Sequence, residues 1–95
     1  MINEENQLIN EMDRARQAQD IVEHPLYQEA VETYRHRLMD EWVASPARDQ
    51  EGREKIWLMI KTAEAVERHL KEIMETGKLA TIQMDRRKKG WFGKN

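Results

Sequence analysis

The amino-acid sequence predicts an all-α protein, built as a long antiparallel helical hairpin with an additional N-terminal helix. The chain of 95 residues contains four glycines and two prolines, and they fall where helices are expected to stop. Apolar residues recur at intervals of three and four, the spacing of one face of a helix. The sequence shows no strand-like alternation of apolar and polar residues and no hairpin turn signal. We therefore expect one helical domain over residues 1–84, followed by a flexible basic tail over residues 85–95.

The first helix is expected over about residues 3–22. Leu8, Met12, Ala15 and Val22 recur at helical spacing on one face, but small and polar side chains fill much of the remainder. The first turn is acidic, which complements the partial positive charge of a helix N-terminus. This helix has a thin apolar face, so we expect it to depend on a partner surface.

The second helix is expected over residues 25–44. Pro25 marks its start, because proline disfavours the helical conformation in the residue before it and suits the first helical position. The apolar stripe has spacings of four, three, four and four, which suits one buried face. It consists of Tyr27, Val31, Tyr34, Leu38 and Trp42. The segment from Ser45 to Asp49, with Pro46, then breaks the helix.

The third helix is expected over residues 50–76. Asp49 is placed to cap it, because its carboxylate can accept a hydrogen bond from an amide of the first turn. The apolar residues follow the a and d positions of a coiled-coil heptad. They are Ile56, Met59, Ala63, Val66, Leu70 and Ile73. Gly77 is expected to end the helix, since glycine readily takes the left-handed conformation that follows a helix C-terminus.

The apolar stripe of the third helix is longer than the second helix can cover. About a dozen large apolar residues are available over the two helices, which is marginal against the conformational entropy of ordering a chain of this length. We therefore expect a homo-oligomer, or docking of this helix on another protein, with Trp57 and Ile60 in the protein interface. A monomeric three-helix bundle is the alternative.

The C-terminal segment separates the charges of the chain. Its net charge is +4, so the other residues carry −6 of the overall formal charge of −2. The cations Arg86, Arg87, Lys88 and Lys89 are followed by Trp91 and Phe92. Cations followed by aromatic residues can bind phosphates and stack on bases, or bind a protein groove. We expect this segment to contact nucleic acid, an acidic partner protein or the acidic part of a neighbouring copy.

Residue patterns that carry chemistry are scarce. The chain has no cysteine, which excludes disulfides and cysteine-ligated metals, and Ser45 is its single serine, in a turn. Glu32 and His36 share a helical face, but the paired Glu-x-x-His motifs of a carboxylate metal bundle are absent. No phosphate-binding glycine loop is present. We expect no enzymatic activity, no cofactor and no metal, and, without an apolar run of membrane length, no membrane partner.

The stretch from His24 to Ala80 resembles small uncharacterised helical proteins encoded by tailed bacteriophages. His24-Pro25-Leu26 opens a helix that reaches Trp42, and the segment from Ser45 to Lys55 leads into Ile56-Trp57-Leu58. His69-Leu70 then precedes Met74-Glu75-Thr76-Gly77-Lys78-Leu79-Ala80. The resemblance covers about 60% of the chain and brings no catalytic or ligand residues. It implies a phage protein of virion assembly, DNA packaging or interference with a host protein.

These observations together favour a non-enzymatic, oligomerising phage protein that acts through protein–protein contacts in the virion or its assembly. One alternative is a nucleic-acid-binding or DNA-packaging accessory protein that uses the basic tail. Another is a small inhibitor of a host protein. The expected location is the virion or the host cytoplasm.

Overall fold

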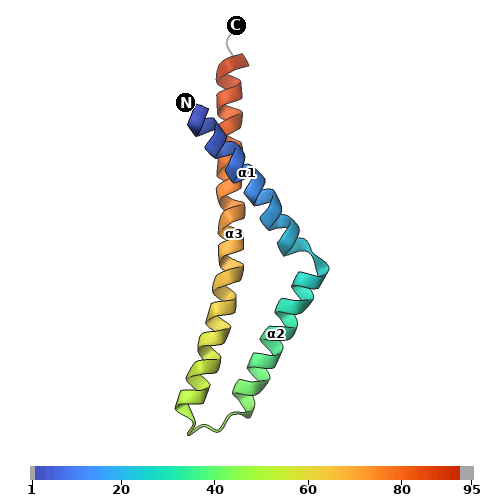
Figure 1. Cartoon of the computed structure of the whole chain (residues 1–95), viewed down its shortest axis with the longest axis vertical. Helices are drawn as coiled ribbons and strands as arrows, with labels where there is room; N and C mark the ends of the chain where they lie inside the picture. Colours follow the sequence, from blue (N-terminus) through green and yellow to red (C-terminus); the bar gives the residue numbers. More distant parts are fainter. Residues whose placement is uncertain (1, 93–95) are drawn as a thin grey trace. The chain divides into compact units, whose positions relative to one another are not determined.

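The computed structural model describes the backbone of residues 2–92 and the side chains of residues 3–90. Within this range the chain forms three helices and no strand, which confirms the predicted all-α class (Figure 1). The helices are α1 (Ile2–Glu23), α2 (Pro25–Ala44) and α3 (Gln50–Phe92). The bounds of α1 agree with the prediction to within one residue, and those of α2 agree fully.

Local side-chain chemistry sets where α2 and α3 begin. His24 has an extended backbone, and its Nδ1 accepts a hydrogen bond of 3.1 Å from the amide of Leu26. Asp49 caps α3 as expected, because its Oδ1 accepts a hydrogen bond of 3.0 Å from the amide of Gly52. Both caps satisfy amides that have no partner within the helix.

α3 extends well beyond the predicted end at Thr76. The helix continues through Gly77 to Phe92, and no glycine in the described chain has a positive φ. The prediction that Gly77 ends the helix is therefore wrong, and residues 85–92 form the last turns of α3 rather than a separate tail. Residues 93–95 of the predicted tail lie outside the described residues. A glycine inside a helix costs only about 1 kcal/mol relative to alanine, and α1 packs against α3 at this glycine.

The chain divides into two compact units. The hairpin unit comprises Val22–His69, which includes α2, the connecting loop and the N-terminal half of α3. The terminal unit combines α1, up to Ile21, with α3 from Leu70 onward. Each unit therefore consists mainly of two helices, with α3 contributing one half to each.

The hairpin unit is held together by one buried leucine and by contacts of arginine side chains. Leu38 of α2 is only 4% exposed. Near the loop, the Arg53 guanidinium lies 3.7 Å from the centroid of the Trp42 ring. Its Nη1 donates to the carbonyls of Trp42 and Ser45 and to the Ser45 hydroxyl, at 3.3, 3.1 and 3.0 Å. Further along, Arg35 pairs with Glu67 at 2.8 Å. These contacts connect α2 to α3 and fix them as a hairpin.

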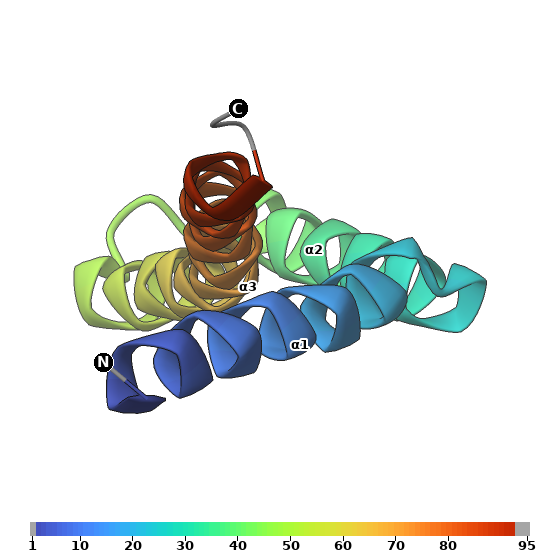
Figure 2. The same ribbon diagram turned by 90° about the horizontal axis from the view of Figure 1, so that it is seen from above.

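In the terminal unit, α1 runs opposite in chain direction to the C-terminal half of α3 (Figure 1), and the view from above shows the two helices crossing (Figure 2). Its buried cluster contains Leu8 of α1 with Ala80 and Met84 of α3, and Met12 packs against it. Nearby, the backbones of α1 and α3 approach closely at Gly77. A Cβ at this position would overlap the Cβ of Ala15. The small side chains of α1, which gave it a thin apolar face in the sequence, thus allow a close helix crossing.

Candidate functional site

The hairpin unit exposes an apolar surface that its own helices do not cover. A shallow groove of about 290 Å³ runs along α3 beside α2. It is lined by Tyr34, Leu58, Met59, Thr62, Ala63 and Val66. Leu58, Met59 and Tyr34 are about half exposed, and Val66 is 57% exposed. We call these six residues the apolar groove.

The position of α2 beside the heptad stripe of α3 explains why this surface stays uncovered. The a positions Ile56, Ala63 and Leu70 are half-buried, whereas the d positions Met59 and Val66 are exposed. On the other side of the a positions, Ile60 and Glu67 are also half-buried. α2 therefore packs beside the predicted stripe rather than over its centre, and the d positions remain open to a further helix.

The residues predicted to form the interface do not lie in this groove. Trp57 is 51% exposed, but it lies on a different side of α3 from the groove. There the Nζ of Lys61 lies 5.7 Å from the centroid of its ring. Ile60 is half-buried and does not line the groove. Met59 and Val66 belonged to the predicted stripe, yet their exposure depends on where α2 packs, which the spacing alone does not indicate.

The four consecutive cations of the C-terminal segment do not share one face. Successive residues of a helix point about 100° apart, so Arg86, Arg87, Lys88 and Lys89 are distributed around α3. Arg87 is already engaged by α1, at 2.8 Å from Glu4 and 3.7 Å from Glu5. The described part of this segment therefore does not form a single cationic surface. Trp91 and Phe92 belong to the last turn of α3, and their side chains lie outside the description.

The contact between Arg87 and Glu4 gives a testable titration. A hydrogen bond from Arg87, and then its charge, hold the pKa of Glu4 below its ordinary value. Because the folded-state pKa is depressed, the pair stabilises the protein above the ordinary glutamate pKa and loses this effect as pH falls through the lowered pKa. We expect Arg87→Gln to raise the pKa of Glu4 toward its ordinary value. NMR titration of the Glu4 side-chain carboxyl carbon measures this pKa. Arg86→Gln is the matched control and should leave the pKa of Glu4 unchanged.

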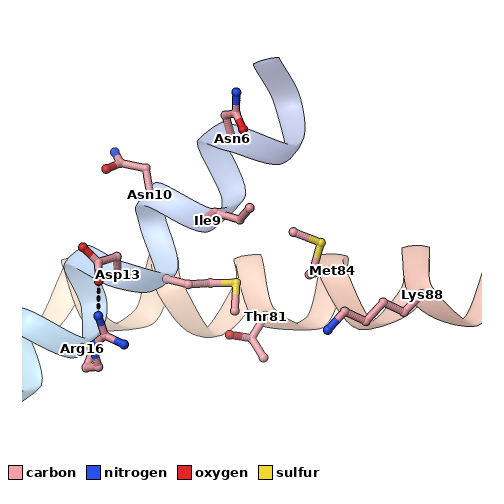
Figure 3. Close-up of a pocket in the computed structure, with 9 residues that line it drawn as sticks. Asn6, Ile9, Asn10, Asp13, Arg16, Thr81, Met84 and Lys88 are labelled. Carbon is pink, nitrogen blue, oxygen red and sulfur yellow. Dashed lines mark hydrogen bonds and ion pairs between the residues drawn. The ribbon is translucent and has the colours of Figure 1, made fainter. Parts of the chain in front are cut away.

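A second groove lies in the terminal unit, between α1 and α3, with a volume of about 820 Å³ (Figure 3). Ile9 and Met84 point into it from the two helices, while Asn6 and Asn10 stand toward its edge. Arg16 is paired with Asp13 at one end. The groove is open and mixed in polarity: the Thr81 hydroxyl donates to the Gly77 carbonyl at 3.0 Å, and the Asp13 carboxylate accepts from Arg16 and Gln17.

Other kinds of site receive no support within the described range. No group of three or more metal-ligating side chains is found among these residues, and His36 pairs with Glu32 at 3.0 Å. None of the described helices has an apolar stretch long enough to cross a membrane.

The comparisons with known proteins do not assign this chain to a class of protein. No protein family model, curated protein or solved structure matches the chain. The resemblance to helical phage proteins therefore stays a prediction.

Proposed function

We propose that this chain is a non-enzymatic, oligomerising helical protein of a tailed bacteriophage, which acts through protein–protein contacts in virion structure or assembly. The observation that supports this proposal most strongly is the apolar groove of the hairpin unit. A folded protein gains about 25 cal/mol for each Å² of apolar surface that it removes from water. Covering half-exposed Met59, Val66 and Leu58 therefore favours association. The expected location is the virion or the host cytoplasm.

Protein contact is a better fit to the described surface than nucleic-acid contact. Binding along a phosphate backbone requires concentrated positive charge. The four C-terminal cations point to different sides of α3, and one of them, Arg87, is paired with Glu4 and Glu5. A host-protein inhibitor would use the same apolar surface toward another chain, so it differs from our proposal in the partner and not in the kind of contact.

Oligomerisation is tested by light scattering after size-exclusion chromatography. We expect the full chain to have at least twice its monomer mass of 11.4 kDa, and Val66→Glu to shift it to the monomer. A glutamate in the interface would be buried without a partner, which is strongly unfavourable.

Val43→Glu is the matched control for this experiment. Val43 is 74% exposed near the end of α2, and it lies nine residues after Tyr34, which is half a turn around the helix. The substitution should leave the mass unchanged. A wild-type chain that stays at 11.4 kDa at high concentration would contradict the proposal, and circular dichroism checks that both variants remain helical.

A further inference from the structure

The heptad stripe of α3 continues past the segment in which the sequence shows it. After Leu70 and Ile73, the next positions in the same register are Gly77, Ala80, Met84 and Arg87. All four of these later positions meet α1, through the close approach at Gly77, the cluster of Ala80 and Met84 with Leu8, and the ion pair of Arg87. One half of the stripe is thus covered by a helix, and the other half, at Met59 and Val66, is exposed.

The exposed half of the stripe carries no formal charge. The face that includes Met59 and Val66 runs from Leu58 to Leu70 without an aspartate, glutamate, lysine or arginine, although such residues make up 36% of the chain. Its residues are Leu58, Met59, Thr62, Ala63, Ala65, Val66, His69 and Leu70. Depletion of charge distinguishes the centre of protein interfaces from other surface. A surface without charge can also face its own copy without repulsion between like charges.

The polar group at the centre of this face is already satisfied. Thr62 lies between Met59 and Val66, and its hydroxyl donates a hydrogen bond of 2.8 Å to the carbonyl of Leu58 one turn earlier. Burying Thr62 would therefore not leave an unpaired donor in an apolar interface, which is otherwise costly. The centre of the stripe is suited to close contact with another helix.

We infer that the apolar groove takes α3 of a second copy of this chain, antiparallel and centred close to Thr62. In this pairing Met59 of each copy packs against Val66 of the other. The inference rests on the proposed oligomeric function and names its partner and geometry. The seam is spaced for a helix, and α3 of another copy offers the same exposed d positions in return.

The position of α1 selects the antiparallel arrangement. In a parallel pair, the α3 helix of the second copy would continue along the half of the stripe that α1 covers from Gly77 onward. In an antiparallel pair centred close to Thr62, the two α3 helices overlap over about residues 50–75, before the positions that meet α1 from Gly77 onward. The antiparallel arrangement also places opposite ends of the helix dipoles together.

The natural absence of cysteine makes this geometry measurable by disulfide formation. Met59→Cys and Val66→Cys are prepared separately, mixed in equal amounts and oxidised, and the products are identified by intact mass. In the antiparallel pair, Met59 faces Val66 of the other copy. The two copies of Met59 are therefore offset by seven residues, which is roughly 10 Å along the helix axis, and so are the two copies of Val66. This distance is beyond the reach of a disulfide. We expect the mixed disulfide to exceed either homodimer at least tenfold, and Thr62→Cys to link to itself. Val43→Cys gives the background of random collision.

The possible outcomes separate this inference from the proposed function. Efficient homodimers of both Met59→Cys and Val66→Cys would indicate a parallel pair and overturn the antiparallel geometry while leaving oligomerisation intact. Linking at the background level in a chain that light scattering shows to be oligomeric would mean that another surface associates, and would also overturn the inference. A monomeric wild-type chain would contradict the proposed function itself.

Discussion

Replacing Gly77 with alanine is expected to destabilise the protein by up to about 2 kcal/mol, although alanine is the better helix former. A Cβ at this position would overlap the Cβ of Ala15 and lie 3.1 Å from the carbonyl oxygen of Glu11. Both neighbours belong to the α1 helix, so α1 would have to move away as a whole. Overpacking of this kind typically costs about 1–3 kcal/mol, which exceeds the gain of about 1 kcal/mol in helix propensity.

Gly90 provides a matched control in the same helix. A Cβ built there has no atom within 4 Å, so Gly90→Ala should keep or raise stability by up to about 1 kcal/mol. The free energy of unfolding is measured by urea titration followed by circular dichroism. Equal shifts for the two variants would mean that α1 does not pack closely against Gly77.

A second substitution identifies the clash directly. Ala15→Gly removes the Cβ that the new side chain would meet, so the double variant should be more stable than the sum of the two single effects predicts. Neighbouring residues in contact commonly show coupling of about 0.5–3 kcal/mol. Additive effects would place the cost of Gly77→Ala elsewhere, for example at Glu11.

Gly77 also shows why part of the fold could not be predicted from the sequence. The starts of α2 and α3 depend on residues within a few positions of Pro25 and Asp49, so local chemistry predicted them. Whether Gly77 ends a helix or allows a close crossing depends on Ala15, which is distant in the chain. The local sequence favours the interpretation that Gly77 ends a helix. Only the packing of α1 shows that it allows a close helix crossing.

The candidate site was predictable to a similar extent. Spacing placed Met59 and Val66 on the apolar stripe, and marginal core size predicted an uncovered surface. Trp57 is expected in the interface as part of the stripe that the second helix cannot cover, yet it does not line the groove. Which half of a stripe stays exposed is decided by the positions of the two other helices, and the heptad does not contain that information.

Removing the Arg53 side chain is also expected to lower the free energy of unfolding strongly. Arg53→Ala would lose the contact with the Trp42 ring and the donor to the Trp42 and Ser45 carbonyls. A hydrogen bond to a charged group contributes about 1.5–3 kcal/mol, and a cation–π contact at an exposed site about 0.5–1 kcal/mol. Because these contacts share one side chain and are partly solvated, we expect a total loss of about 1–3 kcal/mol.

A lysine at position 53 is not expected to stabilise the hairpin as Arg53 does, although it keeps the positive charge. The planar guanidinium both stacks on Trp42 and donates to three oxygens near Ser45, and an ammonium group cannot do both. Arg53→Lys is therefore expected to retain less than half of the stabilisation. Urea unfolding gives the free energies, and Trp42 fluorescence in a background with Trp57→Phe and Trp91→Phe reports on the loop end of the hairpin.

Lys55→Ala is the matched control for the arginine. Lys55 lies in the same part of α3, and its contact is an exposed pair with Glu51 at 3.7 Å. Such pairs contribute only about 0.3–0.5 kcal/mol, so the free energy of unfolding should hardly change. If Arg53→Ala were no more destabilising than Lys55→Ala, the contacts at Trp42 and Ser45 would not be what holds the hairpin. If Arg53→Lys matched the wild type, positive charge alone would suffice and the stacked geometry would be unnecessary.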